Sequence, residues 1–300
     1  MVIDTKEKAL DCAIRDFETT NPSQYGFIVF LKNSKPYENY MSNEAWKDFR
    51  IKMANHHCRQ FEDGDGGELI GKKGRYGYYP PKMACFGSSS RFIYQYSKTI
   101  EGFCFEKQLP TRIGHIANLD GYLPQKDIDI FVEAKCREIY SNHKTIKIKK
   151  VYQVVYDFIK ESHPDFTYEA KGIEDDNENF KCTFKYDNKV IEHFDIKQLI
   201  CHFLGITANV LENRQYKPIK FIYLIFNPEQ VKEKIDPKYR DTILSTYQET
   251  IKEIESLGDI HWLFDTILDL QMDNLKLHTD QRPPFEFVLT DQNHYHQHLK

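Results

Sequence analysis

The chain has 300 residues, of which 40% are hydrophobic and 14% aromatic, enough for one large domain or a core with an elaborated flank. Its formal net charge of −4 at pH 7 gives no general attraction to nucleic acid, so a polyanion would have to meet a local basic surface. The longest apolar run, residues 221–226, is far shorter than the roughly 20 residues that span a bilayer, and the charged amino terminus lacks a secretory signal, so we expect a cytoplasmic protein with no membrane partner.

Two helices are predicted near the amino terminus. Apolar residues recur at helical spacing over residues 5–17 and, among charges, over residues 43–61. Between residues 63 and 81 the composition changes to glycine, tyrosine and basic residues, which predicts a loop. Its cations alternate with aromatic residues and suit a phosphate backbone, although a solvated loop held to the core by its tyrosines is at least an equal alternative; these cations are Lys72, Lys73 and Arg75.

A helix and three strands are predicted next. The three serines at 88–90 offer capping hydroxyls to a helix that continues through residues 91–97. Three strand-like runs separated by short turns follow, as is typical of an antiparallel meander; they cover residues 103–109, 116–123 and 128–136.

The third run carries the most informative pattern. Because side chains alternate between the faces of a strand, Glu133 and Lys135 share one face with Asp129 and Phe131, while the other face is wholly apolar. With the apolar face on a core, the carboxylate and the ammonium lie side by side opposite it, where they suit a hard cation and a phosphate oxygen. In the preceding strand the apolar run ends on an aspartate and a glycine, Asp120 and Gly121. The combination suits metal-dependent phosphodiester cleavage, and an ordinary charged face of a half-exposed strand is the alternative.

The segment after the third strand looks less regular. An amphipathic helix is predicted over residues 151–159. Glu169 and Lys171 repeat the acid-x-lysine spacing, but they lead into Gly172 and an acidic stretch without apolar alternation, which predicts a loop. We interpret residues 160–180 as a surface insertion.

Helices and strands are again predicted in the last part of the chain. Asp195 and Gly205 mark the start and the end of a short helix. Residues 219–226 form the nearly all-apolar run expected of a buried central strand. More helix is expected over residues 238–274, and a late strand over residues 285–289.

The order of these elements, with an acid on the second strand and acid-x-lysine on the third, resembles the PD-(D/E)XK nuclease superfamily. The likeness covers residues 87–227, with Leu119 in place of the proline of the nominal motif. Several longer segments look like a bacterial group of restriction endonuclease-like proteins: residues 87–91, 105–107, 118–122, 132–138 and 196–199. The resemblance implies an α/β fold with a restriction-endonuclease-like core, α-β-β-β-α-β, in which a central mixed sheet is flanked by helices.

The resemblance also implies roles for individual residues. Asp120 and Glu133 would bind Mg²⁺, for which Mn²⁺ is a possible substitute, and Lys135 would hold the attacking water or stabilise the pentavalent phosphate. Gln198 would orient a water or a phosphate. The acid that such proteins often carry on the first helix is missing, and Glu106 is a better substitute than Glu101, with a surface strand acid as the equal alternative.

Two arginines complete the expected contacts with nucleic acid. Arg91 begins the first core helix, and Arg137 continues the face of the acid-x-lysine strand. A salt bridge from Arg137 to Glu138 or Asp129 is the alternative to a contact with a polyanion.

The expected organisation is a nuclease-like core over residues 87–227 with an insertion at about 141–194. A helical and Gly/Tyr/Lys-rich flank, residues 1–86, and C-terminal helices with a late strand, residues 228–300, would pack on it. The implied function is a Mg²⁺-dependent endonuclease that hydrolyses DNA in restriction or another defence. The alternatives are a nuclease-fold module that has lost turnover and binds nucleic acid or protein, and an RNA-directed nuclease. A homodimer is expected by analogy with the fold.

Overall fold

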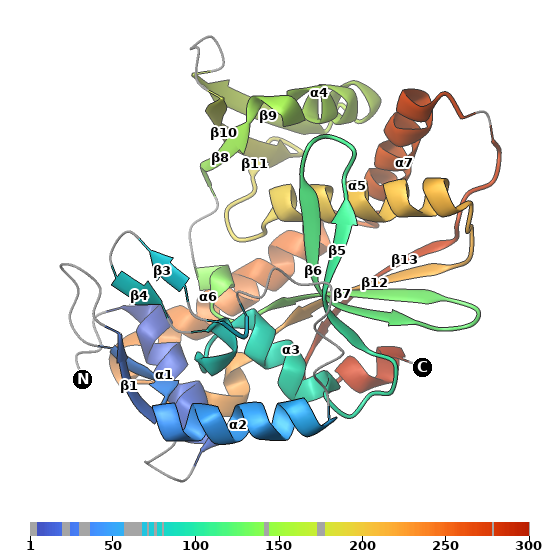
Figure 1. The fold of residues 1–300 in the computed structure, drawn as a ribbon. Helices are drawn as coiled ribbons and strands as arrows, with labels where there is room; N and C mark the ends of the chain where they lie inside the picture. Colours follow the sequence, from blue (N-terminus) through green and yellow to red (C-terminus); the bar gives the residue numbers. More distant parts are fainter. Residues whose placement is uncertain are drawn as a thin grey trace.

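A five-stranded mixed sheet lies at the centre of the computed structural model (Figure 1). The structure describes residues 5–19, 25–29, 37–56, 68–70, 72–74, 77–79, 81–140, 144–172, 178–277 and 279–299. The strand order is β13-β12-β7-β6-β5; the strands are β5 (Cys104–Pro110), β6 (Ile116–Pro124), β7 (Asp129–Lys135), β12 (Ile219–Ile225) and β13 (Phe285–Asp291). β5, β6 and β7 form the predicted antiparallel meander, and β12 and β13 continue it parallel to β7. An α/β architecture with a mixed central sheet is thereby confirmed.

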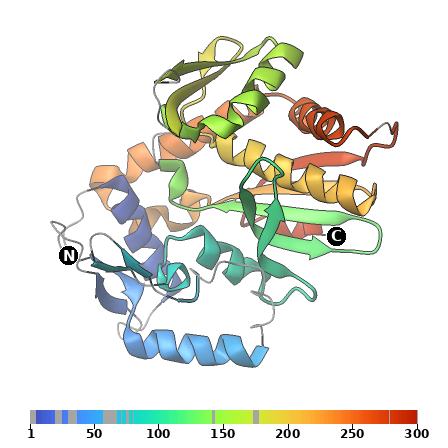
Figure 2. The same ribbon diagram turned by 45° about the horizontal axis from the view of Figure 1, so that its top comes forward.

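Helices cover both faces of this sheet. α3 (Ser89–Ser97) and α5 (Ile196–Asn213) lie on opposite sides of it (Figures 1 and 2). The hydroxyl of Ser88 caps α3 by accepting a hydrogen bond from the backbone N–H of Arg91, at 3.2 Å, as the serine run predicts. Every residue of β7 is buried, so the picture of a half-exposed charged strand is wrong. Its polar side chains lie inside the protein.

α5 is longer than predicted because Gly205 does not end it. Gly205 lies in the middle of the helix, where α5 crosses β5 and β6. A Cβ atom at this position would lie 2.9 Å from the Cβ atoms of both Ala117 and Leu109, which is closer than such atoms approach. The glycine therefore allows close packing of the helix on the β5–β6 hairpin rather than a C-terminal cap.

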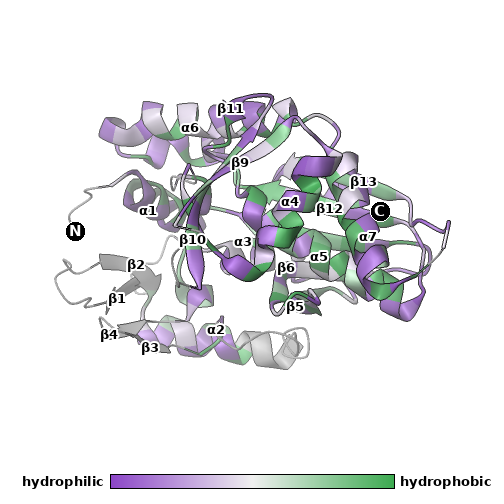
Figure 3. Ribbon diagram, turned by 90° about the horizontal axis from the view of Figure 1, so that it is seen from above, coloured by the Kyte–Doolittle hydropathy of each residue, from purple (hydrophilic) through white to green (hydrophobic). Residues whose placement is uncertain are grey.

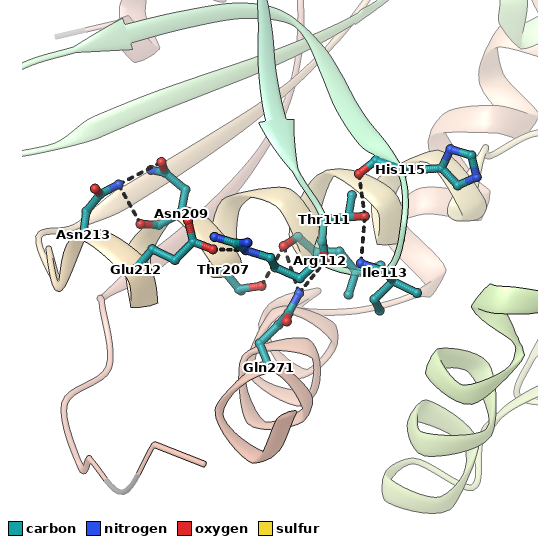
Figure 4. A network of polar contacts seen from close by, with 10 residues as sticks. Thr111, Arg112, Ile113, His115, Thr207, Asn209, Glu212, Asn213 and Gln271 are labelled. Atoms are coloured by element: carbon teal, nitrogen blue, oxygen red, sulfur yellow. Dashed lines mark hydrogen bonds and ion pairs between the residues drawn. The ribbon is translucent and has the colours of Figure 1, made fainter. Parts of the chain in front are cut away.

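The turn of the β5–β6 hairpin is fixed to two helices (Figure 4). Gln271 of α7 (His261–Leu275) donates from Nε2 to the carbonyls of Thr111 at 2.9 Å and Leu204 at 3.2 Å. Arg112 of the turn forms an ion pair with Glu212 of α5. The hairpin is thus held to α5 near both its middle and its C-terminal end.

The insertion forms a sheet of its own, which lies above α5 and away from the central sheet (Figure 2). It comprises β8 (Ile146–Lys149), α4 (Gln153–Ser162), β9 (Phe166–Lys171), β10 (Asn179–Tyr186) and β11 (Lys189–Val190). The loop prediction for Glu169 and Lys171 is wrong, since both lie in β9. Phe166, Tyr168 and Ala170 alternate there with polar residues, a period-two signal that the flanking charges obscured.

The two ends of the chain add further elements. The predicted helices are present as α1 (Lys6–Glu18), α2 (Asn43–His56), α6 (Pro237–Ser256) and α7, and α6 alternates between hydrophilic and hydrophobic residues in Figure 3. Residues 57–61 of the second predicted helix lie outside the described residues. Two short hairpins were not predicted, and the second contradicts the loop expected over residues 63–81; their strands are β1 (Tyr25–Val29), β2 (Tyr37–Met41), β3 (Lys72–Gly74) and β4 (Gly77–Tyr79). Within the described ranges, no helix has the length and apolar character needed to cross a membrane.

The close packing at Gly205 generates a prediction. Gly205→Ala should lower the free energy of unfolding by about 1–3 kcal/mol, although alanine favours helix, because the new methyl group collides with Ala117 and Leu109. Urea denaturation followed by circular dichroism measures the change. Ser245→Ala, at an exposed position of α6, is the matched control and should have almost no effect. Equal stability of the Gly205 variant and the wild type would contradict the packing argument.

Candidate active site

Two acidic residues lie where β6 and β7 separate. The pairing of these strands stops at Gly121 and Val132; beyond it β6 continues beside β5, and β7 continues beside β12 (Figure 1). Asp120 and Glu133 are the next residues on the two strands. The Asp120 Oδ2 atom accepts a hydrogen bond of 2.8 Å from the backbone N–H of Ala134, so this carboxylate is attached to β7 although it belongs to β6.

Lys135 joins Glu133 to the start of α5. Its Nζ atom donates to Glu133 Oε1 at 2.8 Å and also to the side-chain oxygen of Gln198. Glu133 and Lys135 are only 2% and 6% exposed. Gln198 is held in the first turn of α5, where Asp195 caps the helix by accepting from the Gln198 backbone N–H at 3.0 Å. The structure thus brings together Asp120 and the three residues expected to act with it.

His202 is a member of this site that the sequence analysis missed. Its Nε2 atom lies 2.9 Å from Glu133 Oε2, and the ring is 2% exposed. The contact lacks the geometry of a hydrogen bond, and Glu133 Oε2 is buried without a hydrogen-bond partner in the described part of the chain. The signal was available, because His202 follows Gln198 by four residues and this spacing places both on one face of a helix.

Glu106 lies level with Asp120 on the neighbouring strand. The residues before and after it are paired with β6, as Phe105–Gly121 and Lys107–Leu119, but Glu106 itself is not part of the β5–β6 pairing. Its φ of 58° is in the left-handed region, which is strained for a residue with a side chain. Ser90 of α3 donates to Glu106 Oε1 at 3.2 Å. A local turn of the backbone, rather than simple strand alternation, therefore directs this carboxylate.

Two further charges come from the amino-terminal flank. Glu68 is buried, and its Oε1 atom lies 2.7 Å from Lys82 Nζ. We call these two residues, together with Glu106, Asp120, Glu133 and Lys135, the charged cluster. Four carboxylates face two ammonium groups in it, so two negative charges remain uncompensated when all six groups are ionised. Sequence reasoning could not find Glu68 and Lys82, because tertiary packing alone brings them to the site.

The excess of carboxylates in the charged cluster affects the pKa values of its acids. Burial raises the pKa of Asp120 well above its usual range, and the negative charges of Glu133 and Glu106 raise it further. Burial, together with the charge of Glu68, raises the pKa of Glu106 to about 8. Burial alone would also raise the pKa of Glu133, but Lys135 and His202 outweigh it and lower the value to about 2. Glu133 is thus the most acidic of the three carboxyl groups, and Asp120 and Glu106 stay protonated to a higher pH than usual.

The basic residues expected to contact nucleic acid have different environments in the structure. Arg91 is buried; its Nε atom donates to Glu18 at 2.9 Å and its guanidinium lies over the Phe86 ring, so it is not available at the surface. Arg137 forms a salt bridge with Asp11 at 2.7 Å, a partner that the sequence analysis did not expect. The loop cations are not placed: the side chains of Lys72 and Lys73 and all of Arg75 lie outside the described residues.

The donor set suits one kind of metal ion. Among the described residues, no group of three or more His, Cys, Asp or Glu side chains is arranged to hold a metal. Mg²⁺ keeps several waters and uses only one or two carboxylates, so Asp120 and Glu133 are sufficient ligands for it. Glu133 Oε2 accepts no hydrogen bond from a described residue and has the His202 ring beside it, and the cluster carries two excess negative charges when all six of its groups are ionised; both features fit a divalent cation.

Comparisons with known proteins assign no family. The chain matches no protein-family model, no curated protein and no solved structure. The chemistry of the charged cluster is therefore the basis for a function.

The raised pKa of Glu106 has a measurable consequence for stability. The folded protein retains a proton on Glu106 that the unfolded chain releases near its usual pKa of about 4.5, so stability is lost as the pH rises from about 4.5 through about 8. Glu106→Gln should remove this loss and raise the free energy of unfolding at pH 8.5 by about 1 kcal/mol or more. Urea denaturation at pH 5, 7 and 8.5 measures it.

The control is Glu101→Gln, which changes an exposed carboxylate close in sequence. It should leave the pH dependence of stability unchanged. The same pH dependence in Glu106→Gln and in the wild type would show that Glu106 is ionised normally.

Proposed function

We propose that this protein is a Mg²⁺-dependent endonuclease that hydrolyses DNA phosphodiester bonds and has a PD-(D/E)XK-like core. The observation that carries the proposal is the buried Glu133–Lys135 pair with Asp120 beside it, at the point where two strands separate. The succession α3, β5, β6, β7, α5, β12 has the order that the family resemblance implies. Gln198 at the start of the helix that follows adds a fourth member in the expected place.

Each residue has a chemical task in this proposal. Mg²⁺ bound by Asp120 and Glu133 would supply a Lewis acid that lowers the pKa of a bound water and offsets charge on the phosphate. Lys135 is kept charged and directed by Glu133, so its ammonium can stabilise an additional negative charge on a phosphate oxygen. The carbonyl of Gln198 accepts from Lys135, which leaves its amide N–H₂ group to donate to a water or a phosphate.

The first test is metal-dependent cleavage. Supercoiled plasmid, linear DNA and RNA are incubated with Mg²⁺, Mn²⁺ or EDTA, and nicking of DNA should require a metal. Asp120→Asn, Glu133→Gln and Lys135→Gln should each reduce the rate by about a hundredfold or more, because each removes a group that stabilises charge in the transition state. Circular dichroism checks that each variant is folded, since a broken buried pair costs stability.

Asp127→Asn, at an exposed position in the β6–β7 turn, is the control and should cleave like the wild type. Cleavage of RNA alone would assign an RNA-directed nuclease. Metal-independent binding without any cleavage would assign a binding module, and equal cutting by all variants would place the activity elsewhere.

The second test is independent of substrate. Because a ligand that binds only the folded state stabilises it, Mg²⁺ at a hundred times its Kd should add about 2.7 kcal/mol to the free energy of unfolding. The gain should be larger at pH 8 than at pH 6, since the ion must displace protons from acids whose pKa values are raised. Thermal denaturation with Mg²⁺ and with EDTA measures it. An unchanged gain in Asp120→Asn would exclude this site.

A further inference from the structure

Lysines gather on the outer face of the insertion sheet. Phe180, Cys182 and Phe184 of β10 are buried, and Tyr156 of α4 packs on the Phe184 ring at 5.0 Å, so this side of the sheet is covered. The alternating residues point the other way. The lysines on that outer side form what we call the basic face; they are Lys147, Lys149, Lys171, Lys181 and Lys185.

Three of these lysines stand in a row across three strands. Lys181 of β10 is paired directly with Lys147 of β8 on one side and with Lys171 of β9 on the other. All three are exposed, and none forms an ion pair with any residue that the structure describes. They line a cavity of about 990 Å³ at the end of the sheet.

Among the described residues, no acid near the basic face forms an ion pair with a lysine of this row. Glu169 forms an ion pair with Lys185, and Glu178 lines the cavity without pairing with a lysine of the row. Residues 173–177 add three acids to the sequence but lie outside the described residues. Like charges directly opposite each other repel and destabilise a sheet, and Lys181 stands opposite a lysine on each side. The negative charges of a bound polyanion would attract these lysines and offset the repulsion between them.

We propose that the basic face binds the phosphate backbone of double-stranded DNA. The choice of DNA as the polyanion rests on the proposed nuclease function. The residues between the lysines are polar: the hydroxyls of Thr145 and Thr183 lie 3.2 Å apart, and Thr167 lies opposite Lys185. Hydroxyls of this kind donate to phosphate oxygens, whereas a membrane surface would call for apolar side chains.

The position of the insertion in the chain connects the basic face with the charged cluster. The chain leaves the central sheet directly after Lys135, and it returns at Asp195, which caps the helix that carries Gln198. Both connections of the insertion therefore lead to elements that carry site residues, β7 with Lys135 and α5 with Gln198. Because its four carboxylates outnumber its two ammonium groups, the cluster offers a phosphate backbone no net attraction before a cation is bound, so a separate basic surface is the better candidate to hold DNA.

The test compares two triple variants with equal changes in charge. Lys147→Gln, Lys171→Gln and Lys181→Gln together remove the row; Lys47→Gln, Lys126→Gln and Lys234→Gln together remove three exposed lysines elsewhere. Fluorescence anisotropy with a labelled 30-base-pair duplex in EDTA, over a series of salt concentrations, measures binding without cleavage. The row variant should bind more than about tenfold more weakly at low salt, and its slope of log K against log salt should be shallower by about 3.

The outcomes separate this inference from the nuclease proposal. Thermal denaturation should show the row variant to be at least as stable as the wild type, because repulsion has been removed. Equal loss of binding in both triple variants, unchanged binding in the row variant, or no duplex binding by the wild type would overturn the inference, even where cleavage of DNA persists. A loss confined to single-stranded RNA would also overturn it. Row-dependent DNA binding by a protein that never cleaves DNA would support the inference and contradict the nuclease.

Discussion

The ion pair between Glu133 and Lys135, buried in the middle strand of the sheet, is the constraint on which the rest of the site depends. Two charges taken out of water carry a desolvation cost that their mutual attraction offsets only with additional partners. Gln198 supplies one such partner to the ammonium, and His202 lies beside the second carboxylate oxygen. A pair of well-packed apolar residues would often stabilise the strand as much or more, so the contribution of this ion pair to stability does not by itself explain its presence.

The sequence predicted the parts of this arrangement that are local. Period-two alternation identified β5, β6 and β7, and the apolar run identified β12, because these patterns depend only on neighbouring residues. The shared face of Glu133 and Lys135 followed from the same alternation, and Asp120 was identified by its place at the end of an apolar run on the preceding strand. What the sequence did not show is that β7 is buried on both faces, because that depends on helices far away in the chain.

The residues that the sequence analysis predicted wrongly or missed share one physical cause. Arg91 looked like a surface cation because its partner Glu18 is 73 residues distant in sequence. Glu68 and Lys82 reach the charged cluster by the same kind of long-range packing. Gly205 has the usual signature of a helix end, yet its role is set by the methyl and methylene groups of the hairpin against it. In each case a contact between distant segments overrides a local preference.

The anchoring of the β5–β6 hairpin has a mechanical consequence. α5 bears Gln198 and His202 at its beginning and contacts the hairpin further along, at Gly205 and Glu212, while the hairpin bears Asp120. The contacts between α5 and the hairpin therefore fix the position of Asp120 relative to Gln198 and His202. Gln271 touches none of the charged groups, but its hydrogen bonds hold the hairpin to α5. Loss of these bonds would shift Asp120 relative to Gln198 and His202 while every side chain of the charged cluster is retained.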